Sequence, residues 1–325
     1  MSTLTREKIS NKKNILITGG MGFIGSHLTK KYIQNNDHVY ILSRSYNNIS
    51  NLSGIEDKVN FIIKDIRDIT ESDVANKDYI FHLAGTVDNY AVKEGQPYKD
   101  IEVNCNGTIA LLEAVKNSNP KTRIIFASTF FVNGNVSKLP VDVNSPCNPL
   151  GLYGATRLAA EHFCHVYNKV FGLDSLIARF TNVFGPFEKG DNKKKAGFNF
   201  MINQAVKGEE VQLYNNGNFI RDYIFVDDVV DACMTLAEKG QTDKVYYVGR
   251  GEFVKFKKLT DIIQDQIPNI KIKTIEPPEF HKNVGIIDFV CDNSDLKELG
   301  WTPKISLEEG IKRTIEFYRG RNNQI

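Results

Sequence analysis

The fold of this chain is decided by a glycine-rich stretch close to its start, NILITGGMGFIGSHL at residues 14–28. The apolar, β-branched residues 14–18 predict a buried strand, and residues 23–35 carry the apolar spacing of an amphipathic helix. A glycine-rich turn therefore lies directly between a strand and a helix. Glycines spaced in this way are a weak signal alone, but between a strand and a helix they predict a dinucleotide-binding turn.

Each glycine of this turn has a physical reason. Gly19 permits a tight exit from the strand, Gly22 lets the backbone approach a pyrophosphate, and Gly25 lets the helix pack closely on the sheet. The start of the helix offers unpaired N–H groups and a partial positive charge to the phosphates. We therefore expect the turn, together with Phe23 and Ile24, to hold the cofactor.

Short β-branched runs alternate with longer helical patterns over the first 180 or so residues. Near-continuous apolar strands separated by helices are typical of a parallel sheet that is covered on both faces. The sequence therefore predicts an α/β fold of the Rossmann type, with a doubly wound parallel sheet. The expected strands span 14–18, 38–44, 59–66, 79–83, 123–128 and 175–183, and the expected helices span 23–35, 97–117 and 153–171.

The rhythm of the chain changes after about Asn182, where Gly185-Pro186 breaks it and shorter, mixed elements follow. Segments near 222–250, among them expected strands at 222–226 and 245–248, can return to the main sheet. The expected parts are a flexible leader at 1–12, a dinucleotide-binding Rossmann domain at 13–180, and a smaller C-terminal α/β lid at 181–325 that mainly binds the substrate.

The composition argues against several classes of protein. The 325 residues include 41 basic and 39 acidic side chains, without the concentrated basic excess of a nucleic-acid-binding protein. No apolar run approaches the roughly 20 residues that span a bilayer, and residues 1–13 lack the apolar core of a signal peptide. The five cysteines include no C-x-x-C pair, which suits a reducing cytoplasm and gives no zinc signature. We therefore expect a cytoplasmic protein that binds neither nucleic acid nor membrane.

The end of the second strand indicates which dinucleotide binds. NAD sites usually place an acidic residue there, about 20 residues after the glycine turn, to hold the ribose hydroxyls. Here the strand ends in Ser43-Arg44. A carboxylate would repel a 2′-phosphate, whereas Arg44 can pair with it through charge-assisted hydrogen bonds. We therefore predict that Ser43 and Arg44 select NADP(H); the alternative, in which Arg44 is merely solvated, leaves NAD(H).

Two more strand ends are placed to contact the cofactor. Asp65-Ile66, at the end of the third strand, would flank the adenine. Leu83-Ala84-Gly85, after the fourth strand, would run beneath the cofactor. We expect His82, just before them, to be a buried, hydrogen-bonded side chain and not a catalyst.

A second motif carries the candidate chemistry. The segment YGATR at 153–157 opens a helix, and Tyr153 and Arg157 point the same way because residues four apart share a helix face. Upstream, Ser128-Thr129 ends a strand whose carboxyl edge faces the cofactor crevice. These four residues are therefore the candidate catalytic group.

Here the sequence resembles the extended short-chain dehydrogenase/reductases, specifically their nucleotide-sugar branch, the NAD-dependent epimerase/dehydratase family. The likeness runs from about residue 13 to the C-terminal helix, which is nearly the whole chain. It implies an NAD(P)-dependent enzyme that modifies a nucleotide-diphosphate sugar. The motifs that carry it are TGGMGFIG at 18–25, YGATRLAAE at 153–161, RFTNVFGP at 179–186 and RDYIFVDD at 221–228.

The resemblance assigns catalytic roles that chemistry can justify. Tyr153 would be the acid or base for the oxygen on the carbon that exchanges a hydride, and Thr129, with Ser128, would hold the same oxygen. A tyrosine with a pKa of about 10 needs a neighbouring cation to work at neutral pH. The family normally has lysine where Arg157 stands. Arginine keeps the positive charge and can donate to the ribose, but it cannot relay a proton.

The resemblance also implies a pocket for the two ligands. Phe180 and Val183 would line the nicotinamide. Arg221 is the expected diphosphate clamp, because a planar guanidinium matches phosphate oxygens; its alternative role is a salt bridge to Asp222 or Asp227. The implied substrate-binding residues are Thr86, Thr129, Asn182, Gln212, Leu213, Tyr214 and Arg221.

Phe130 and Phe131 depart from one branch of the family. Its dehydratases, which remove the 6-hydroxyl of the sugar, typically place Asp-Glu directly after the threonine as acid and base for the elimination. Phenylalanines cannot transfer protons. A 4,6-dehydratase is therefore disfavoured, unless Asp88, Glu94 or another carboxylate substitutes.

Relatives commonly pair through two helices. Here these would be the helices at 97–117 and 153–171, which would form a four-helix bundle in a homodimer. His162 and His165 have a spacing that can bind metal, but further ligands are missing. We expect surface or dimer-face histidines and no metal site, and we expect the lysine run at 193–195 to be exposed loop charge.

Three functions fit these residues. The first is an NADPH-dependent reductase of a 4-keto-6-deoxy nucleotide sugar, favoured by Ser43-Arg44, by the absent Asp-Glu pair and by a local likeness to CDP-abequose and paratose synthase-type reductases. The second is a nucleotide-sugar 4-epimerase, although epimerases usually retain the acidic NAD residue. The third is a non-catalytic NADP(H)-binding sensor or scaffold, motivated by Arg157 alone.

Overall fold

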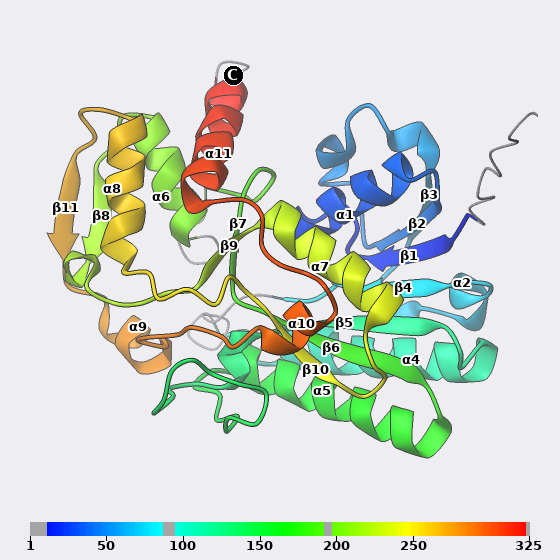
Figure 1. Cartoon of the computed structure of the whole chain (residues 1–325). Helices are drawn as coiled ribbons and strands as arrows, with labels where there is room; N and C mark the ends of the chain where they lie inside the picture. Colours follow the sequence, from blue (N-terminus) through cyan, green and yellow to red (C-terminus); the bar gives the residue numbers. More distant parts are fainter. Residues whose placement is uncertain (1–11, 87–94, 192–196, 323–325) are drawn as a thin grey trace, which may run out of the picture.

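The computed structural model describes residues 12–86, 95–191 and 197–322. Within these residues the centre is a sheet of seven parallel strands, with helices on both faces (Figure 1). The strand order is β10-β6-β5-β4-β1-β2-β3, which confirms the doubly wound α/β fold expected from the sequence. The bounds are Asn14–Thr18 (β1), His38–Ser43 (β2), Val59–Ile63 (β3), Tyr79–His82 (β4), Arg123–Thr129 (β5), Asp174–Phe180 (β6) and Val245–Val248 (β10).

The strands are apolar because both faces of the sheet are covered. One face packs on α1 (Phe23–Gln34) and α7 (Val226–Lys239). The opposite face packs on α4 (Gly107–Ser118) and α5 (Leu152–Phe171). Two hydrophobic cores therefore hold the sheet rigidly, and its carboxyl edge is left to carry polar side chains.

The long helix expected over 97–117 is interrupted. α3 (Tyr98–Asp100) and α4 are joined by η4 (Ile101–Asn106), a π-helical segment. Asn104 lies on this segment and is buried, with its Nδ2 donating to Thr156 Oγ1 at 3.1 Å. π-helical turns are frequent at functional sites, and this one ties the α3–α4 helix to the first turn of α5.

The chain after β6 builds two short sheets beside the carboxyl edge of the main sheet. β7 (Asn182–Phe184) pairs with β9 (Tyr223–Phe225), and β8 (Val211–Tyr214) pairs with β11 (Ile272–Ile275). The segment expected at 222–226 therefore does not enter the main sheet, because its strand pairs with β7 after the chain has left β6. By contrast, β10 lies at the edge of the main sheet, next to β6.

This second part has its own core, rich in aromatic rings. Phe184 lies 5.3 Å from Phe198 and 5.6 Å from Phe225, measured between ring centroids. The core is enclosed by α6, α8 and α11. The remaining helices are α2 (Glu71–Val74), α6 (Gly197–Val206), α8 (Phe256–Gln266), α9 (Glu279–Val284), α10 (Ser294–Glu298) and α11 (Leu307–Asn322). Short 3-10 turns are η1 (Ile49–Leu52), η2 (Glu56–Lys58), η3 (Ile66–Asp68), η5 (Phe130–Val132) and η6 (Asn215–Gly217).

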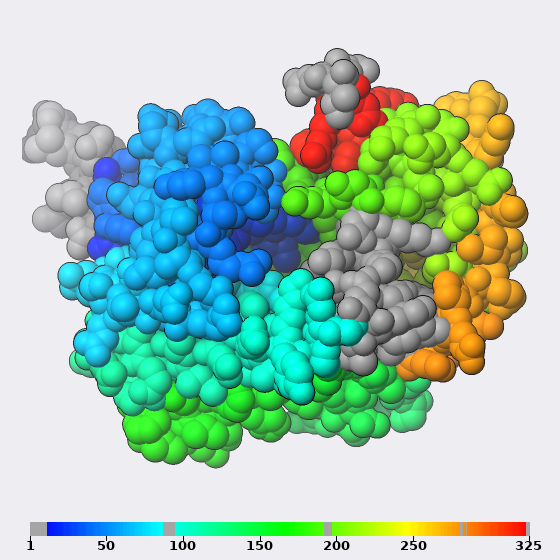
Figure 2. All heavy atoms as spheres, turned by 180° about the vertical axis from the view of Figure 1, so that it is seen from behind, coloured from blue at the N-terminus to red at the C-terminus, as the bar shows by residue number. Residues whose placement is uncertain are grey.

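Figure 2 shows the molecule from behind. The blue and cyan N-terminal segments lie on one side, and the yellow-green to orange segments lie on the other, with the surface hollowed between them. None of the described helices is both long enough and apolar enough to cross a bilayer.

Candidate functional site

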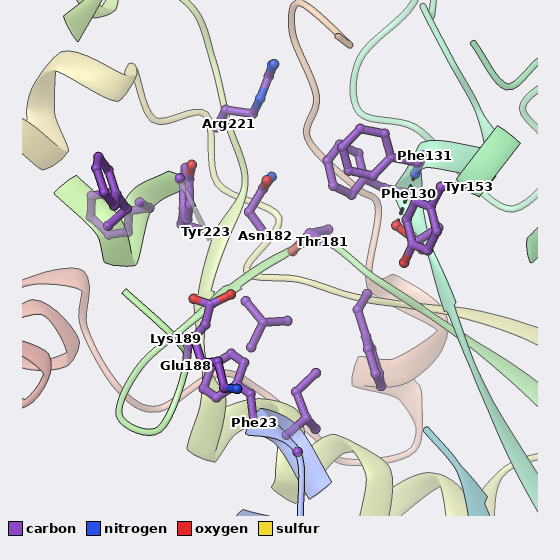
Figure 3. Close-up of a pocket in the computed structure, with 18 of the residues that line it drawn as sticks. Phe23, Phe130, Phe131, Tyr153, Thr181, Asn182, Glu188, Lys189, Arg221 and Tyr223 are labelled. Atoms are coloured by element: carbon purple, nitrogen blue, oxygen red, sulfur yellow. Dashed lines mark hydrogen bonds between the residues drawn. The ribbon is translucent and has the colours of Figure 1, made fainter. Parts of the chain in front are cut away.

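A cavity of about 1280 Å³ lies where the carboxyl edge of the main sheet meets the second part of the chain. This volume exceeds the roughly 300–1,000 Å³ usual for one small ligand, so two ligands can lie in it side by side. In Figure 3, Tyr153, Phe130 and Phe131 lie on one side of it and Tyr223 on the other. The expected residues that line it are Gly19, Gly22, Phe23, Ile24, Gly25, Leu83, Gly85, Ser128, Thr129, Tyr153, Arg157, Phe180, Asn182, Val183, Gln212, Tyr214 and Arg221.

The glycine turn leaves no room for side chains where a pyrophosphate would pass. Gly19 has φ +73°, in the left-handed region that favours glycine. The Gly22 N–H donates to the Gly19 carbonyl at 2.8 Å and closes the turn at the start of α1. A Cβ on Gly25 would lie only 2.4 Å from the Gly19 oxygen. The turn thus fits a dinucleotide in the way the glycine spacing indicates.

Some expected residues do not belong to the cavity lining. Strand alternation explains Leu213, which is buried in the core of the second part while its neighbours Gln212 and Tyr214 line the cavity. Ile66 lies beyond the end of β3 and packs beneath α4, against Gly107. The expected residues absent from the described lining are Ser43, Arg44, Asp65, Ile66, Ala84, Thr86 and Leu213.

The expected adenine end of the site differs most from the sequence prediction. A hydrogen bond from the Arg67 side chain (2.9 Å) holds the pKa of the Asp65 carboxyl below its usual value. Arg44 is exposed at the end of β2. Asn48 and Asn51, from the polar stretch after β2, line the cavity instead.

Tyr153 and Thr129 both line the cavity, from α5 and the end of β5. Tyr153 is buried, and its ring meets Phe131 edge-on at 5.9 Å. Thr129 Oγ1 accepts a hydrogen bond from the Phe131 N–H at 3.3 Å, so the hydroxyl proton remains available for a ligand oxygen. The pair can therefore hold one oxygen and exchange a proton with it.

The hydroxyl proton of Ser128 forms a hydrogen bond within the protein. Its hydroxyl donates to Glu161 Oε1 at 2.5 Å, so it can only accept from a substrate group. Glu161 also pairs with Arg179 in a bidentate arrangement, with distances of 3.0 and 2.7 Å, and both side chains are buried. Arg179 reaches the Tyr247 hydroxyl at 3.3 Å. Ser128 is thus part of a buried network that joins α5, β5, β6 and β10.

Arg157 lies beside Tyr153 and is only 4% exposed. Its Nη1 donates to the Ala127 carbonyl at 3.1 Å, and its Cζ lies 5.7 Å from the centre of the Tyr153 ring. Among the described residues its Nε has no hydrogen-bond partner. A buried cation therefore lies next to the Tyr153 ring.

His82 is buried and uncharged. Burial, and secondarily the charge of Arg157, lower the pKa of His82 to about 3. Its Nε2 lies 3.1 Å from Thr108 Oγ1, which itself donates to a backbone carbonyl, and its Nδ1 lies 2.8 Å from Thr18 Oγ1. A neutral ring with the proton on Nε2 satisfies both contacts. His82 is therefore the buried, hydrogen-bonded side chain that the sequence predicts.

Phe130 and Phe131 form an apolar wall next to Thr129. Their ring centroids are 4.5 Å apart, and Phe130 also packs on Phe289 at 4.7 Å. Among the described lining residues, the carboxylates are Glu188 and Asp191, which come from the loop after β7. The possible substitutes Asp88 and Glu94 lie outside the described residues.

Arg221 lines the cavity, but its guanidinium forms hydrogen bonds to backbone carbonyl groups. Its guanidinium donates to the carbonyl oxygens of Ile286 and Ile287, in the segment after α9. The alternative salt bridges are not formed within the described chain. Asp222 accepts from backbone N–H groups, with the shortest bond, 2.8 Å, coming from Arg250.

The two histidines of α5 do not belong to a cluster of candidate metal ligands among the described residues. His165 Nδ1 lies 2.8 Å from Asp243 Oδ1, and His162 is exposed. Over residues 12–86, 95–191 and 197–322, no three His, Cys, Asp or Glu side chains form a candidate metal site. The lysine run at 193–195 lies outside these residues.

Comparison with known proteins identifies the family. Residues 15–249 match the model of the NAD dependent epimerase/dehydratase family. The chain belongs to this family. A putative UDP-glucose 4-epimerase of Methanocaldococcus jannaschii is 33% identical over 313 residues, which cover 95% of this chain and 99% of that protein. The family and the enzyme class expected from the motifs are thus confirmed.

Solved structures of similar proteins agree with the fold of this family member. UDP-N-acetylglucosamine 4-epimerase from Methanobrevibacter ruminantium superposes with a TM-score of 0.89 at 26% identity, covering 95% of this chain and 99% of that one. UDP-glucuronic acid 4-epimerase from Bacillus cereus, solved with UDP-glucuronic acid and NAD, gives a TM-score of 0.83 at 26% identity with the same coverage.

The close approach of Gly85 to Arg157 leads to a first prediction. A Cβ at position 85 would lie 1.9 Å from Arg157 Nη2, so Gly85→Ala must displace the guanidinium. We expect affinity for the dinucleotide cofactor to fall by roughly tenfold or more, the equivalent of about 1.4 kcal/mol, measured by fluorescence titration. Adding Arg157→Lys, a thinner cation, should restore much of it. Unchanged affinity in the single Gly85→Ala variant would contradict this reading.

Proposed function

We propose that this family member reduces a 4-keto-6-deoxy nucleotide sugar and uses NADPH for the reaction. When bound, the dinucleotide supplies the hydride. Tyr153 donates its proton to the C4 oxygen as the carbonyl becomes a hydroxyl, and the free Thr129 proton forms a hydrogen bond to the same oxygen. The buried Arg157 cation stabilises the phenolate that remains.

One observation carries the choice of substrate: the apolar wall of Phe130 and Phe131 beside Thr129. By the family resemblance, the residues after this threonine face C6 of the sugar. A methyl group packs well on aromatic rings, whereas a 6-hydroxyl or carboxylate there would lose hydrogen bonds to water, at a cost of about 1–3 kcal/mol. The wall also offers no acid and base for the elimination of water, which argues against a 4,6-dehydratase.

The choice of NADP(H) rests on the end of β2. Arg44 is exposed there, and neither a hydrogen bond nor an ion pair joins its side chain to the described residues around it. It can therefore pair with a 2′-phosphate, since Asp65, the nearby carboxylate on which its charge also acts, forms its ion pair with Arg67. The solved relatives from Thermus thermophilus and Bacillus cereus hold NAD, so this is a proposed departure from them.

The reductase proposal predicts the behaviour of Tyr153. Mixed with NADPH and a 4-keto-6-deoxy nucleotide sugar, the enzyme is expected to consume the two in equal amounts, followed by the loss of NADPH absorbance. Tyr153→Phe removes the proton donor, so kcat should fall by roughly 10²–10⁴ while NADPH affinity is nearly unchanged. Thr129→Val, which removes one hydrogen bond, should have a smaller effect. A Tyr153→Phe enzyme with full turnover would refute the assignment.

A second candidate, a nucleotide-sugar 4-epimerase, is favoured by the names of the relatives, among them UDP-glucose and UDP-glucuronate epimerases. An epimerase would convert a saturated nucleotide sugar without net change of cofactor. A second assay with a saturated nucleotide sugar, run beside the NADPH assay above, therefore distinguishes the two reactions. Binding of NADPH without turnover in either assay would favour a non-catalytic sensor or scaffold.

Cofactor choice gives a prediction for Arg44. Loss of a charge-assisted contact to the 2′-phosphate costs about 1.5–3 kcal/mol, so Arg44→Asp should weaken NADPH binding by roughly ten- to a hundredfold and improve NADH binding. Arg319→Asp, which makes the same charge change at an exposed arginine on α11, is the matched control and should leave the preference unchanged. Equal affinity of the unmodified enzyme for both dinucleotides would defeat the proposal.

We also propose that the protein is a homodimer built through α5 and the α3–α4 helix. Apolar side chains stand exposed on these adjacent helices: Tyr98 is 72% and Val170 is 64% exposed, with Ile101 and Val166 beside them. Exposed apolar surface of this kind is typical of interfaces.

We expect a dimeric mass in solution by light scattering. Val170→Glu should convert it to a monomer, and Phe253→Glu, at an exposed site elsewhere, should not. A monomer at micromolar concentration would exclude the bundle.

A further inference from the structure

The loop between β7 and α6 turns an acidic side chain into the cavity. Phe187 has φ +69°, a left-handed conformation that is rare for a bulky residue. Glu188 follows it and lines the cavity, and Figure 3 shows it between Phe23 and Asn182. Backbone outliers persist only where surrounding contacts hold them, and they gather at ligand sites.

The contacts on both sides of Glu188 are specific. The Phe187 ring packs edge-on against His27 at 5.4 Å and Phe317 at 5.0 Å. The Tyr318 hydroxyl donates to the Glu188 carbonyl at 2.9 Å. The backbone is therefore pinned between α1 and α11.

The Glu188 carboxyl lies among groups that do not neutralise it. No described side chain donates a hydrogen bond to it or forms an ion pair with it, and burial raises its pKa to about 8. It is therefore largely protonated at neutral pH and can donate. The titratable and charged groups around it are Lys189 and Asp191 of its own loop, His27 and Lys30 of α1, Arg221 and Tyr223 at β9, and Tyr318 of α11.

The residues near Glu188 indicate which ligand its carboxyl contacts. Phe23 stands at the start of α1, where the glycine turn fits a pyrophosphate. Asn182 stands on the side of the proposed substrate diphosphate, with Arg221 farther along that side (Figure 3). Both ligands are anionic, and an ionised carboxylate between them would repel either one. We propose that the Glu188 carboxyl donates a hydrogen bond to a phosphate oxygen of a bound diphosphate, so that binding takes up a proton. This inference rests on the proposed function, in which both ligands are diphosphates.

The direction of the pH effect follows from the linkage between proton and ligand. A ligand that binds only the protonated acid loses affinity once the pH exceeds the pKa of about 8 in the free protein. Dissociation constants should therefore rise by about tenfold between pH 7 and pH 9. Glu188→Gln is neutral at every pH and keeps an N–H donor, so its affinity should stay nearly constant over the same range.

Calorimetric titration at pH 8.5 tests the proposal directly. Binding heats measured in two buffers of different ionisation enthalpy give the number of protons taken up. NADP⁺ alone and UDP alone serve as probes, because their phosphates titrate near pH 6 and contribute little. We expect most of one proton to be taken up with the diphosphate that contacts Glu188, and none in Glu188→Gln. Uptake with NADP⁺ only assigns the contact to the cofactor, and uptake with UDP only assigns it to the substrate.

Three results would overturn the inference: no uptake with either probe, release of a proton, or the same uptake in Glu188→Gln. A melting curve shows whether that variant is folded, and the unmodified protein decides the question if it is not. Turnover is measured separately. Proton uptake without reduction of a 4-keto sugar would contradict the proposed reaction and would still support the role of Glu188.

Discussion

The buried ion pair between Glu161 and Arg179 connects the elements that carry the chemistry. Glu161 lies on α5, two turns after Tyr153, and Arg179 lies on β6, so the bidentate contact fixes the helix against the sheet. The same carboxylate accepts the Ser128 proton at the end of β5. Removing one partner of such a pair leaves an uncompensated buried charge, which costs about 3–5 kcal/mol. The orientation of Tyr153 toward Thr129 therefore depends on an interaction that touches neither ligand.

A second constraint acts one turn earlier on α5. Arg157 is packed into the space above Gly85, where any side chain would overlap its guanidinium. Its positive charge adds to burial in lowering the pKa of His82. By the family resemblance, arginine at this position would keep the positive charge of the usual lysine and would not relay a proton.

The sequence predicts the regular part of this molecule well and its long-range contacts poorly. The strands of the main sheet and the glycine turn could be predicted, because apolar periodicity and glycine spacing are local signals. The π-helical turn at Asn104 depends on a partner in α5, some 50 residues later. Arg221 likewise finds its partners at Ile286 and Ile287, and Ser128 finds Glu161, through tertiary contacts that no local pattern contains. The burial of Leu213, by contrast, follows from strand alternation and was open to prediction.

The departures from the family pattern gather around the cavity, while the frame is kept. Phe130 and Phe131 stand where dehydratases of the family have an acid–base pair, Arg157 stands where the family has lysine, and Glu188 brings a carboxyl of raised pKa into the cavity. None of these side chains belongs to the two cores that hold the main sheet. A change at these positions therefore acts on the cavity and leaves those two cores in place, although Phe130 belongs to a separate buried cluster with Tyr247 and Phe289. For this reason the family motifs define the frame and the cofactor, and the substrate has to be argued from the few side chains that face it.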